Sequence, residues 1–337
     1  MARSATIRDV ASAAGVSIAV VSRVINPGSG PVRAETRDRV LAAIEQLAYR
    51  PRTAARELKQ AGAATTLGLV LADVTNPFFA RLADRVVWEA RSRGVQVLLM
   101  TTQEDPHLEE EALATLVSRR VGGVIATPTA TNPDSWARLR QLDTNVVFVD
   151  RSLDDVPGAH TVSIDNVRSA RQATEHLVDL GHRRIGFISG PETSSTGRAR
   201  TAGHRAVLAE RGVEQDDALV RHVPFRGEQG GDAVGALLAL PEPPTALVVA
   251  NTAQVVAALR RLRLRGTAVP ADLSVVVFDD DPWTELFEPA LTIIRQPIAM
   301  LAAHSVELAL AERASAAEPR SIAVEAEFVP RASTSAP

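Results

Sequence analysis

The chain has 337 residues, too many for one ordinary core, and it has no cysteine, which excludes disulfides, thiolate metal sites and cysteine nucleophiles. Its composition, 45% hydrophobic and 23% charged, is globular and excludes long disorder outside the ends. The net charge of −3 is unevenly divided, because residues 1–60 carry +5 and the rest of the chain carries −8. A basic head on an acidic body suits contact with a polyanion, although a merely solvated basic surface would give the same count.

Residues 1–50 are predicted to form a helix-turn-helix DNA-binding domain. Thr6 followed three residues later by Asp9 resembles a capping box, and the apolar residues after it recur at helical spacing. Gly15 ends this predicted helix, because glycine readily adopts the left-handed conformation of a tight stop. Ser17 then offers an N-cap for a second helix, so the segment has the layout of two helices joined by a short turn.

The second helix presents two different faces. Val21 and Val24 fall on the side of the partner helix, whereas the other side carries Ile18, Ala19, Ser22 and Arg23. Small residues let the backbone approach the floor of a groove, and Arg23 can reach a guanine edge with two donors. A small helical bundle with a solvated arginine is the alternative interpretation.

A third helix is predicted from about Ala34 to Ala48, followed by a hinge helix and linker over residues 51–65. The buried stripe expected in the third helix consists of Val40, Leu41, Ile44 and Leu47. Pro51 can open the hinge helix, but an apolar stripe one turn long is too short to be stable alone. It needs a partner, either another protomer or a DNA groove, and the basic residues Arg52, Arg56 and Lys59 favour the groove.

From Leu67 onward, short apolar runs alternate with helical periods. The runs are "LGLVLAD", "VQVLLM", "GGVIATP", "NVVFVD", "RIGFISG", "TALVVAN" and "SVVVFDD", and "SIAVEAEFVP" is expected as the last strand. Continuous apolar runs suit strands that are buried on both faces, and their alternation with helices predicts parallel sheets. We therefore expect residues 66–331 to form an α/β body of two doubly wound parallel-sheet lobes, and residues 332–337 to form a disordered tail.

Polar or aromatic residues follow several of these runs. Asp73 precedes "NPFF", and Asp150, Arg151, Asn251 and Asp279 each follow a predicted strand. Ligands bind beyond the carboxyl ends of strands in doubly wound sheets, so these positions argue for one cleft. Any single aspartate after a strand is more simply explained as a cap of the next helix.

The head resembles a known family. The runs "TIRDVASAAGVSIAVVSRVIN", "ETRDRVLAAIEQLAYRP" and "AARELK" closely resemble the DNA-binding head and hinge of the lactose-repressor (LacI/GalR) family. This resemblance implies that Ile18, Ala19 and Arg23 face base edges in the major groove, and that Ala55 and Leu58 of paired hinge helices enter the minor groove. The predicted DNA-binding set is completed by Thr6, Ser17, Ser22, Asn26 and Arg56.

The body resembles the effector domain of the same family, which is similar to periplasmic sugar-binding proteins with two lobes, three crossovers and a ligand between the lobes. The resemblance implies that Phe78 and Phe79 pack on the ligand, that Phe225 stacks in the cleft, and that Arg200 clamps hydroxyls or a carboxylate. The predicted ligand-binding set is completed by Asp73, Asp150, Asn251, Asp279 and Gln296.

Four residues depart from the family pattern. Val20 replaces a usual threonine and removes a hydroxyl donor, and Thr252 stands where an aspartate usually follows the asparagine. Val277 replaces a usual glycine, and His204 replaces an aromatic residue. We expect His204 to be a packed residue and not a ligand contact.

These features together predict a sequence-specific transcriptional regulator, a repressor that acts as a cytoplasmic homodimer on a near-palindromic operator. A small ligand, a sugar or related polyol, is expected to bind between the lobes and control DNA affinity allosterically. The alternative is a sugar-binding or sugar-handling protein whose basic head serves another role, and control by a protein corepressor also stays open. No heptad repeat follows the last predicted strand, which disfavours a tetramer built by a coiled coil.

No enzyme, cofactor, metal or membrane span is expected. The seven histidines show no metal-ligand spacing, and there is no phosphate-cradling glycine loop and no nucleophile elbow. The three carboxylates of "FDDDP" point in different directions, which favours solvated or capping roles over a metal site. The N-terminal residues lack the apolar core of a secretory signal, and no apolar run approaches the length of a membrane span.

Overall fold

The computed structural model describes residues 5–25, 31–47, 49, 66–129, 133–142, 144–154, 156–312 and 318–337. The chain divides into two units, residues 1–63 and residues 64–337. The hinge predicted over residues 51–65 lies outside the described residues. In the part of the chain that is described, no helix combines the length and the apolar character needed to cross a bilayer.

The first unit contains the three predicted helices, α1 (Ile7–Ala14), α2 (Ile18–Ile25) and α3 (Ala34–Gln46). Helix α1 is capped by the Asp9 carboxylate, which accepts hydrogen bonds from the backbone N–H and the hydroxyl of Thr6, both at 2.7 Å. It ends at Gly15, whose φ of 64° is left-handed. The core joins Val10, Val21 and Val40, one from each helix, and all three are fully buried. The helix-turn-helix prediction is therefore confirmed.

The stripe predicted for α3 is wrong at one position. Leu41 is 49% exposed, and Ala43 is buried in its place. Val40 and Ala43 are the residues of α3 that are buried in the core shared with α1 and α2. Ile44 and Leu47 are only partly buried and pack against the edge of this core. Periodicity alone does not distinguish the centre of such a core from its margin.

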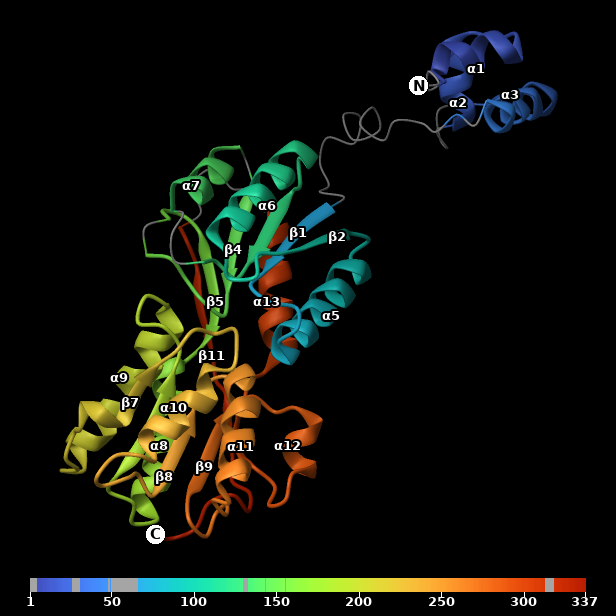
Figure 1. Ribbon diagram of the computed structural model, residues 1–337. Coiled ribbons are helices and arrows are strands. Elements are labelled where there is room, and N and C mark those ends of the chain that lie inside the picture. Colours follow the sequence, from blue (N-terminus) through green and yellow to red (C-terminus); the bar gives the residue numbers. More distant parts are fainter. Residues whose placement is uncertain are drawn as a thin grey trace. The chain divides into compact units, whose positions relative to one another are not determined.

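The second unit forms two α/β lobes (Figure 1), and the first of these contains a six-stranded parallel sheet. Its strand order is β11-β5-β4-β3-β1-β2. The strands are β1 (Thr66–Leu71), β2 (Gln96–Thr101), β3 (Gly123–Ala126), β4 (Asn145–Val149), β5 (His160–Ile164) and β11 (Ser321–Val324). The helices of this lobe are α5 (Pro77–Ser92), α6 (Pro106–Arg119), α7 (Pro133–Gln141) and α13 (Ile298–Leu310).

The second lobe repeats this arrangement with the strand order β12-β10-β9-β8-β6-β7. Its strands are β6 (Ile185–Ser189), β7 (Val220–His222), β8 (Ala246–Val249), β9 (Ser274–Phe278), β10 (Thr292–Arg295) and β12 (Glu327–Val329). Its helices are α8 (Asn166–Asp179), α9 (Ser195–Glu210), η1 (Asp217–Leu219), α10 (Gln229–Leu237), α11 (Thr252–Arg265) and α12 (Pro282–Leu286). Only the edge strand β12 runs antiparallel to its neighbour. The prediction of two doubly wound lobes is confirmed.

The chain crosses between the lobes three times, from β5 to α8, from β10 to α13 and from β11 to β12. The last crossover corrects one expectation, because "SIAVEAEFVP" is not one strand. Its first half pairs with β5 in the first lobe and its second half pairs with β10 in the second. An apolar run does not reveal which sheet each of its residues joins.

The expectation of a disordered tail at residues 332–337 is also wrong. Ser333 is fully buried, and its hydroxyl accepts a hydrogen bond from the N–H of Thr292 and donates one to the carbonyl of Val275. The carbonyl of Ser335 lies 2.9 Å from Nε2 of His182 and also accepts from the hydroxyl of Ser274. A small, polar composition predicts fraying, but here it supplies hydrogen-bond partners for the second lobe.

Candidate functional sites

The face of α2 that was predicted to read DNA is open to solvent. Ile18 is 44% exposed and both Ala19 and Arg23 are exposed, whereas Val21 and Val24 are buried against the other helices. The Ser17 hydroxyl accepts a long hydrogen bond of 3.4 Å from the N–H of Val20. Such a surface, with small residues around one arginine, can enter a major groove. Ser22 is half-buried, and Thr6 caps α1. The other four predicted DNA contacts, Asn26, Ala55, Arg56 and Leu58, lie outside the described residues.

The strand ends of the second unit converge on one cleft between the lobes. All predicted ligand residues except Asp73 line one small cavity of about 10 Å³, which we call the inner compartment. They are Phe78, Phe79, Asp150, Arg200, Phe225, Asn251, Asp279 and Gln296. Arg200 lies on α9, and the other residues follow the strands β1, β4, β7, β8, β9 and β10. Because these strands are parallel, their carboxyl ends lie at the same edge of each sheet, which brings the residues together.

The two adjacent phenylalanines are positioned by the start of α5. Asn76 caps this helix, since its side chain accepts a hydrogen bond of 3.0 Å from the N–H of Phe78, and Pro77 occupies the first turn. Phe78 and Phe79 are buried and pack edge to face with ring centroids 5.2 Å apart. Phe78 and Phe79 thus contribute the apolar part of the lining of the inner compartment.

Arg200 is the buried cation of the inner compartment. Its Nε donates to Oδ1 of Asn166 at 2.7 Å, one Nη donates to the carbonyl of Ala250, and its guanidinium lies 4.2 Å from the ring centroid of Phe278. Burial lowers the pKa of Arg200, and the negative charges of Asp150 and Asp279 oppose this change. The arginine that was predicted to clamp a ligand is therefore already held by protein groups at Nε, at one Nη and against the Phe278 ring.

Asp150 and Asp279 occupy matching places, after β4 and after β9. Both have left-handed backbone conformations, with φ values of 69° and 75°. Non-glycine residues seldom adopt this conformation, and it is common at functional sites. Burial raises the pKa of Asp150, whereas Arg151 and Arg200 act to lower it. Asp279 accepts a hydrogen bond of 2.6 Å from Nε2 of Gln296, which joins the acid to the β10–α13 crossover.

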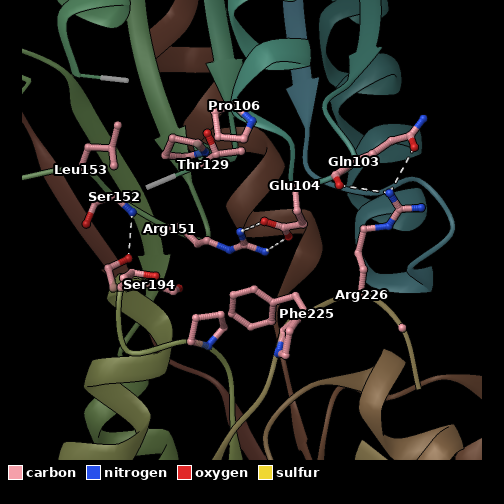
Figure 2. A pocket seen from close by; sticks show the side chains of 16 residues that line it. Gln103, Glu104, Pro106, Thr129, Arg151, Ser152, Leu153, Ser194, Phe225 and Arg226 are labelled. Atoms are coloured by element: carbon pink, nitrogen blue, oxygen red, sulfur yellow. Dashed lines mark hydrogen bonds and ion pairs between the residues drawn. The ribbon is translucent and has the colours of Figure 1, made fainter. Parts of the chain in front are cut away.

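A second, larger cavity of about 600 Å³, which we call the outer compartment, lies between the lobes next to the first (Figure 2). Arg151 and Phe225 line both compartments. The Arg151 guanidinium stacks over the Phe225 ring at 4.1 Å and forms a bidentate ion pair with Glu104, with N–O distances of 2.8 and 2.7 Å. Burial acts to lower the pKa of Arg151, but the hydrogen bond and the negative charge of Glu104, together with other nearby acids, raise it overall.

Asp73 lies apart from the other predicted ligand residues and pairs with Arg226. The Nε of Arg226 lies 3.0 Å from Oδ2 of Asp73. One Nη of Arg226 donates to the carbonyl of Gln103, a contact that Figure 2 shows. A further contact between the lobes is the hydrogen bond from the N–H of Ser152 to the hydroxyl of Ser195, at 3.0 Å. These polar contacts join the two lobes along the outer compartment.

The sequence interpretation missed several residues of the outer compartment. They are Gln103, Glu104, Ser152, Ser194 and Arg226. A usable signal existed for two of them, because Gln103 and Glu104 follow the strand "VQVLLMT" in the same way that Asp150 follows β4. Arg151 was noted at a strand end but was not assigned to the ligand, and its stacking on Phe225 depends on contact between the lobes.

The three carboxylates of "FDDDP" each have a different arginine or glutamine partner. Asp279 accepts from Gln296, Asp280 pairs with Arg295 at 2.7 Å, and Asp281 pairs with Arg81 at 3.1 Å. Within the described ranges, no group of three acidic or histidine side chains has a geometry that could hold a metal ion. The structure thus gives Asp280 and Asp281 ion-pairing roles and gives Asp279 a hydrogen-bonding role.

Two departures from the family pattern are accommodated by packing. His204 is buried, stacks on Phe187 with ring centroids 4.6 Å apart, and its Nδ1 lies 3.0 Å from the Thr174 hydroxyl. Val277 is fully buried in β9. The expectation that His204 is a packed residue is confirmed, whereas the side chain of Thr252 lies outside what is described.

The comparisons with known proteins agree with this architecture. Residues 6–52 match the family described as bacterial regulatory proteins, lacI family, and residues 64–330 match periplasmic binding proteins and the sugar binding domain of the LacI family. The transcriptional regulator DegA of Bacillus subtilis is 35% identical over 87% of each chain. The regulator GalS of Salmonella typhimurium is 34% identical over 90% of this chain and 89% of its own.

Two solved structures cover almost the whole chain. A lac repressor dimer bound to operator and an anti-inducer has a TM-score of 0.79 and 28% identity, covering 99% of this chain and 100% of its own. A complex of the regulator CelR with cellobiose has a TM-score of 0.72 and 32% identity, covering 98% of this chain and 99% of its own.

A helix-turn-helix head and a two-lobed effector unit define a DNA-binding transcriptional regulator. The chain belongs to the LacI family of bacterial regulatory proteins.

Proposed function

We infer that the chain is a cytoplasmic repressor that acts as a homodimer on a near-palindromic operator and is controlled by a polyhydroxylated effector held between its lobes. Two heads are needed because one helix-turn-helix reads only one half-site, and a two-fold operator mirrors a two-fold dimer. One solved relative is a lac repressor dimer bound to its operator. In this assignment Arg23 reads a base edge, and the hinge residues Ala55 and Leu58 contact the minor groove.

The observation that carries the effector assignment is the pairing of charges in the cleft. Arg151 is neutralised by Glu104, Arg226 by Asp73, and Arg200 lies under the influence of two aspartates. Arg151 and Arg226 are thus already paired with carboxylates, and the charge of Arg200 is balanced by the two nearby aspartates, because burying an unbalanced charge is costly. A neutral ligand with many hydroxyls can accept from the arginines and donate to the carboxylates, which is what a sugar or polyol offers.

The effector controls DNA binding only if it binds one arrangement of the lobes more tightly than the other. The cleft meets this requirement, because its lining comes from both lobes and a bound ligand would contact both. Residues that hold the lobes together without ligand, such as Arg226 and Asp73, set the starting position of this equilibrium.

The test is selection of bound sequences from random duplex DNA with the wild-type chain and with Arg23→Ala and Leu58→Ala. We expect a palindromic site whose base preference relaxes in Arg23→Ala and whose affinity falls in Leu58→Ala. Arg119→Ala is the matched control, because it removes an exposed arginine from helix α6 of the effector unit. Enrichment of no sequence, with or without a saccharide mixture, would overturn the regulator assignment.

A further inference from the structure

Glu109 is a buried carboxylate that lies outside the lining of both compartments. It belongs to the first turn of α6, yet its side chain is completely buried. Glutamates are seldom fully buried unless they have partners, because removing a charge from water is costly. In the described part of the chain, the two oxygens of Glu109 accept hydrogen bonds from neutral N–H groups of two different segments.

Each oxygen of Glu109 holds a different segment of the first lobe. Oε2 accepts from the backbone N–H of Thr129 at 2.6 Å, and Oε1 accepts from the indole Nε1 of Trp136 at 3.1 Å. Thr129 follows β3, and Trp136 lies on α7. Hydrogen bonds to an ionised carboxylate are stronger than those between neutral groups, so Glu109 fixes Thr129 relative to both α6 and α7.

Thr129 is part of the wall of the outer compartment, as Figure 2 shows. The chain before it is anchored at Thr127, whose N–H donates to a carbonyl of β1 and whose hydroxyl donates to a carbonyl of β4. Pro128 comes next, also lines the compartment, and has no N–H to donate. The N–H of Thr129 is therefore the next backbone donor after Thr127, and Glu109 is the group that holds this part of the wall.

Trp136 is held in place independently of Glu109. Its ring is fully buried and packs edge to face on Phe148, with ring centroids 5.2 Å apart. Leu139, further along α7, is buried in the same cluster. Loss of the indole hydrogen bond would therefore leave α7 packed, whereas loss of the other hydrogen bond would leave the N–H of Thr129 without its acceptor.

The surroundings of Glu109 favour its protonated form more than water does. Burial raises the pKa of Glu109, and the negative charge of Glu104 acts in the same direction, although the two N–H donors oppose this change. Arg151 interacts with the charge of Glu109 but is already paired with Glu104. The other titratable or charged side chains of α6 and α7 are exposed or half-buried: His107, Glu110, Glu111, Arg119, Asp134, Arg138 and Arg140. Glu109 thus binds a proton at a higher pH than an exposed glutamate.

We propose that Glu109 is a positioning residue of the effector cleft and acts as an acid-sensitive latch for Thr129. The ionised carboxylate holds Thr129 in the wall of the outer compartment. On protonation one oxygen becomes an O–H donor, so the carboxyl group no longer serves two N–H donors equally well. The wall at Thr129 is then released while α7 stays packed. This assignment rests on the proposed function, because it concerns regulation of the same cleft.

The indole N–H of Trp136 reports on this carboxylate directly. NMR of the full chain with isotope-labelled tryptophan gives an indole signal for each of the three tryptophans, and Trp136→Phe identifies the signal of Trp136. Between about pH 8 and about pH 4.5 we expect this signal to shift along one titration curve, with its midpoint above 4.5, the ordinary glutamate value. Glu109→Gln cannot titrate, so the signal should stay fixed in this variant. Glu110→Gln is the matched control, because Glu110 is the next residue of α6 and is exposed, and it should reproduce the wild-type curve.

Hydrogen exchange measures the release of Thr129 on the same samples. After correction for the intrinsic effect of pH on exchange, protection of the Thr129 amide should fall about tenfold or more in the wild type as Glu109 is protonated. In Glu109→Gln the protection should be low at every pH, since one amide oxygen replaces two carboxylate oxygens.

A Trp136 signal that does not titrate, or that titrates equally in Glu109→Gln, would overturn the proposal. Constant protection of Thr129 across the titration would do the same, because Glu109 would then be buried without controlling the wall. If Glu109→Gln does not fold, the curves of the wild type and Glu110→Gln still decide between these outcomes. Neither readout needs operator or effector, so a failure here leaves the regulator assignment standing; loss of operator binding, measured separately on the wild type, would count against the proposed function instead.

Discussion

Arg226 of the second lobe and Asp73 of the first are joined by an ion pair with an Nε–Oδ2 distance of 3.0 Å. Asp73 also accepts hydrogen bonds from the N–H and the hydroxyl of Thr75, so its carboxylate is held in place by its own lobe as well as by Arg226. The same arginine donates to the carbonyl of Gln103. One side chain thus connects its own lobe to two separate loops of the other.

Removing this connection should loosen the closed arrangement of the lobes. We expect Arg226→Ala to increase the radius of gyration of the ligand-free protein in small-angle X-ray scattering. The Arg226 side chain is 39% exposed, so the ion pair contributes little, roughly 0.2–1 kcal/mol. Arg261→Ala is the control, because Arg261 is similarly exposed and pairs with Asp232 within the second lobe. An unchanged radius in Arg226→Ala, or an equal change in both variants, would show that the pair does not hold the lobes.

Gly190 should be sensitive to the smallest possible substitution. In Gly190→Ala the new Cβ atom would lie 2.2 Å from the Phe225 ring, so the ring must move or the backbone must shift. We expect the free energy of unfolding to fall by about 1–3 kcal/mol, the usual cost of overpacking. Urea denaturation measures this loss. If the clash is the cause, Gly190→Ala should cost much less in a Phe225→Ala background, whereas additive losses would exclude this contact as the origin.

The convergence of the cleft residues was predictable because it depends on local features. A buried apolar run followed by an aspartate identifies the carboxyl end of a parallel strand, and such ends meet at one edge of a sheet. Asp150 and Asp279 were found in this way, and both line the inner compartment. The turn at Gly15 and the buried Val21 were likewise predictable, because capping and helical period are properties of a few consecutive residues.

The division of the cleft into an inner and an outer compartment was not predictable from the sequence. Glu104, Arg151 and Phe225 lie far apart in the chain. Glu104 and Arg151 belong to the first lobe and Phe225 to the second, so the stacking of Arg151 on Phe225 depends on how closely the lobes approach. The division of "SIAVEAEFVP" between two sheets has the same origin. Hydrophobic pattern reports that a residue is buried, but it does not report which distant residue covers it.

His204 should make the stability of the effector unit depend on pH. Burial lowers the pKa of His204 from 6.5 to about 3, so the folded chain keeps it neutral where the unfolded chain binds a proton. The stability that comes from keeping His204 neutral is therefore fully present above about pH 6.5, and it is lost progressively as the pH falls toward 3. Between pH 7 and pH 5 the wild type should lose about 2 kcal/mol through this group.

Urea denaturation at both pH values, for the wild type, His204→Phe and His204→Gln, measures this effect. Phenylalanine keeps the stacking on Phe187, and glutamine keeps a donor for the Thr174 hydroxyl, so the two replacements preserve different contacts. Both should reduce the loss between pH 7 and pH 5 by about 2 kcal/mol, whatever their stability at pH 7. If the variants lose as much stability as the wild type, titration of His204 is not responsible.

Ser333 should be a stabilising residue despite its place close to the end of the chain. Its buried hydroxyl accepts from the N–H of Thr292 at 2.8 Å and donates to the carbonyl of Val275 at 2.6 Å. Ser333→Ala leaves the N–H of Thr292 buried without this acceptor, which costs about 1–3 kcal/mol.

Ser335→Ala is the matched control. Among the described residues, the Ser335 hydroxyl donates only to the exposed Ala336 carbonyl, while the Ser335 backbone keeps its bonds to Ser274 and His182. We expect the control to change the free energy of unfolding by less than about 0.5 kcal/mol. Equal losses in the two variants, measured by urea denaturation, would mean that the segment is held by its backbone alone and that the Ser333 hydroxyl adds nothing.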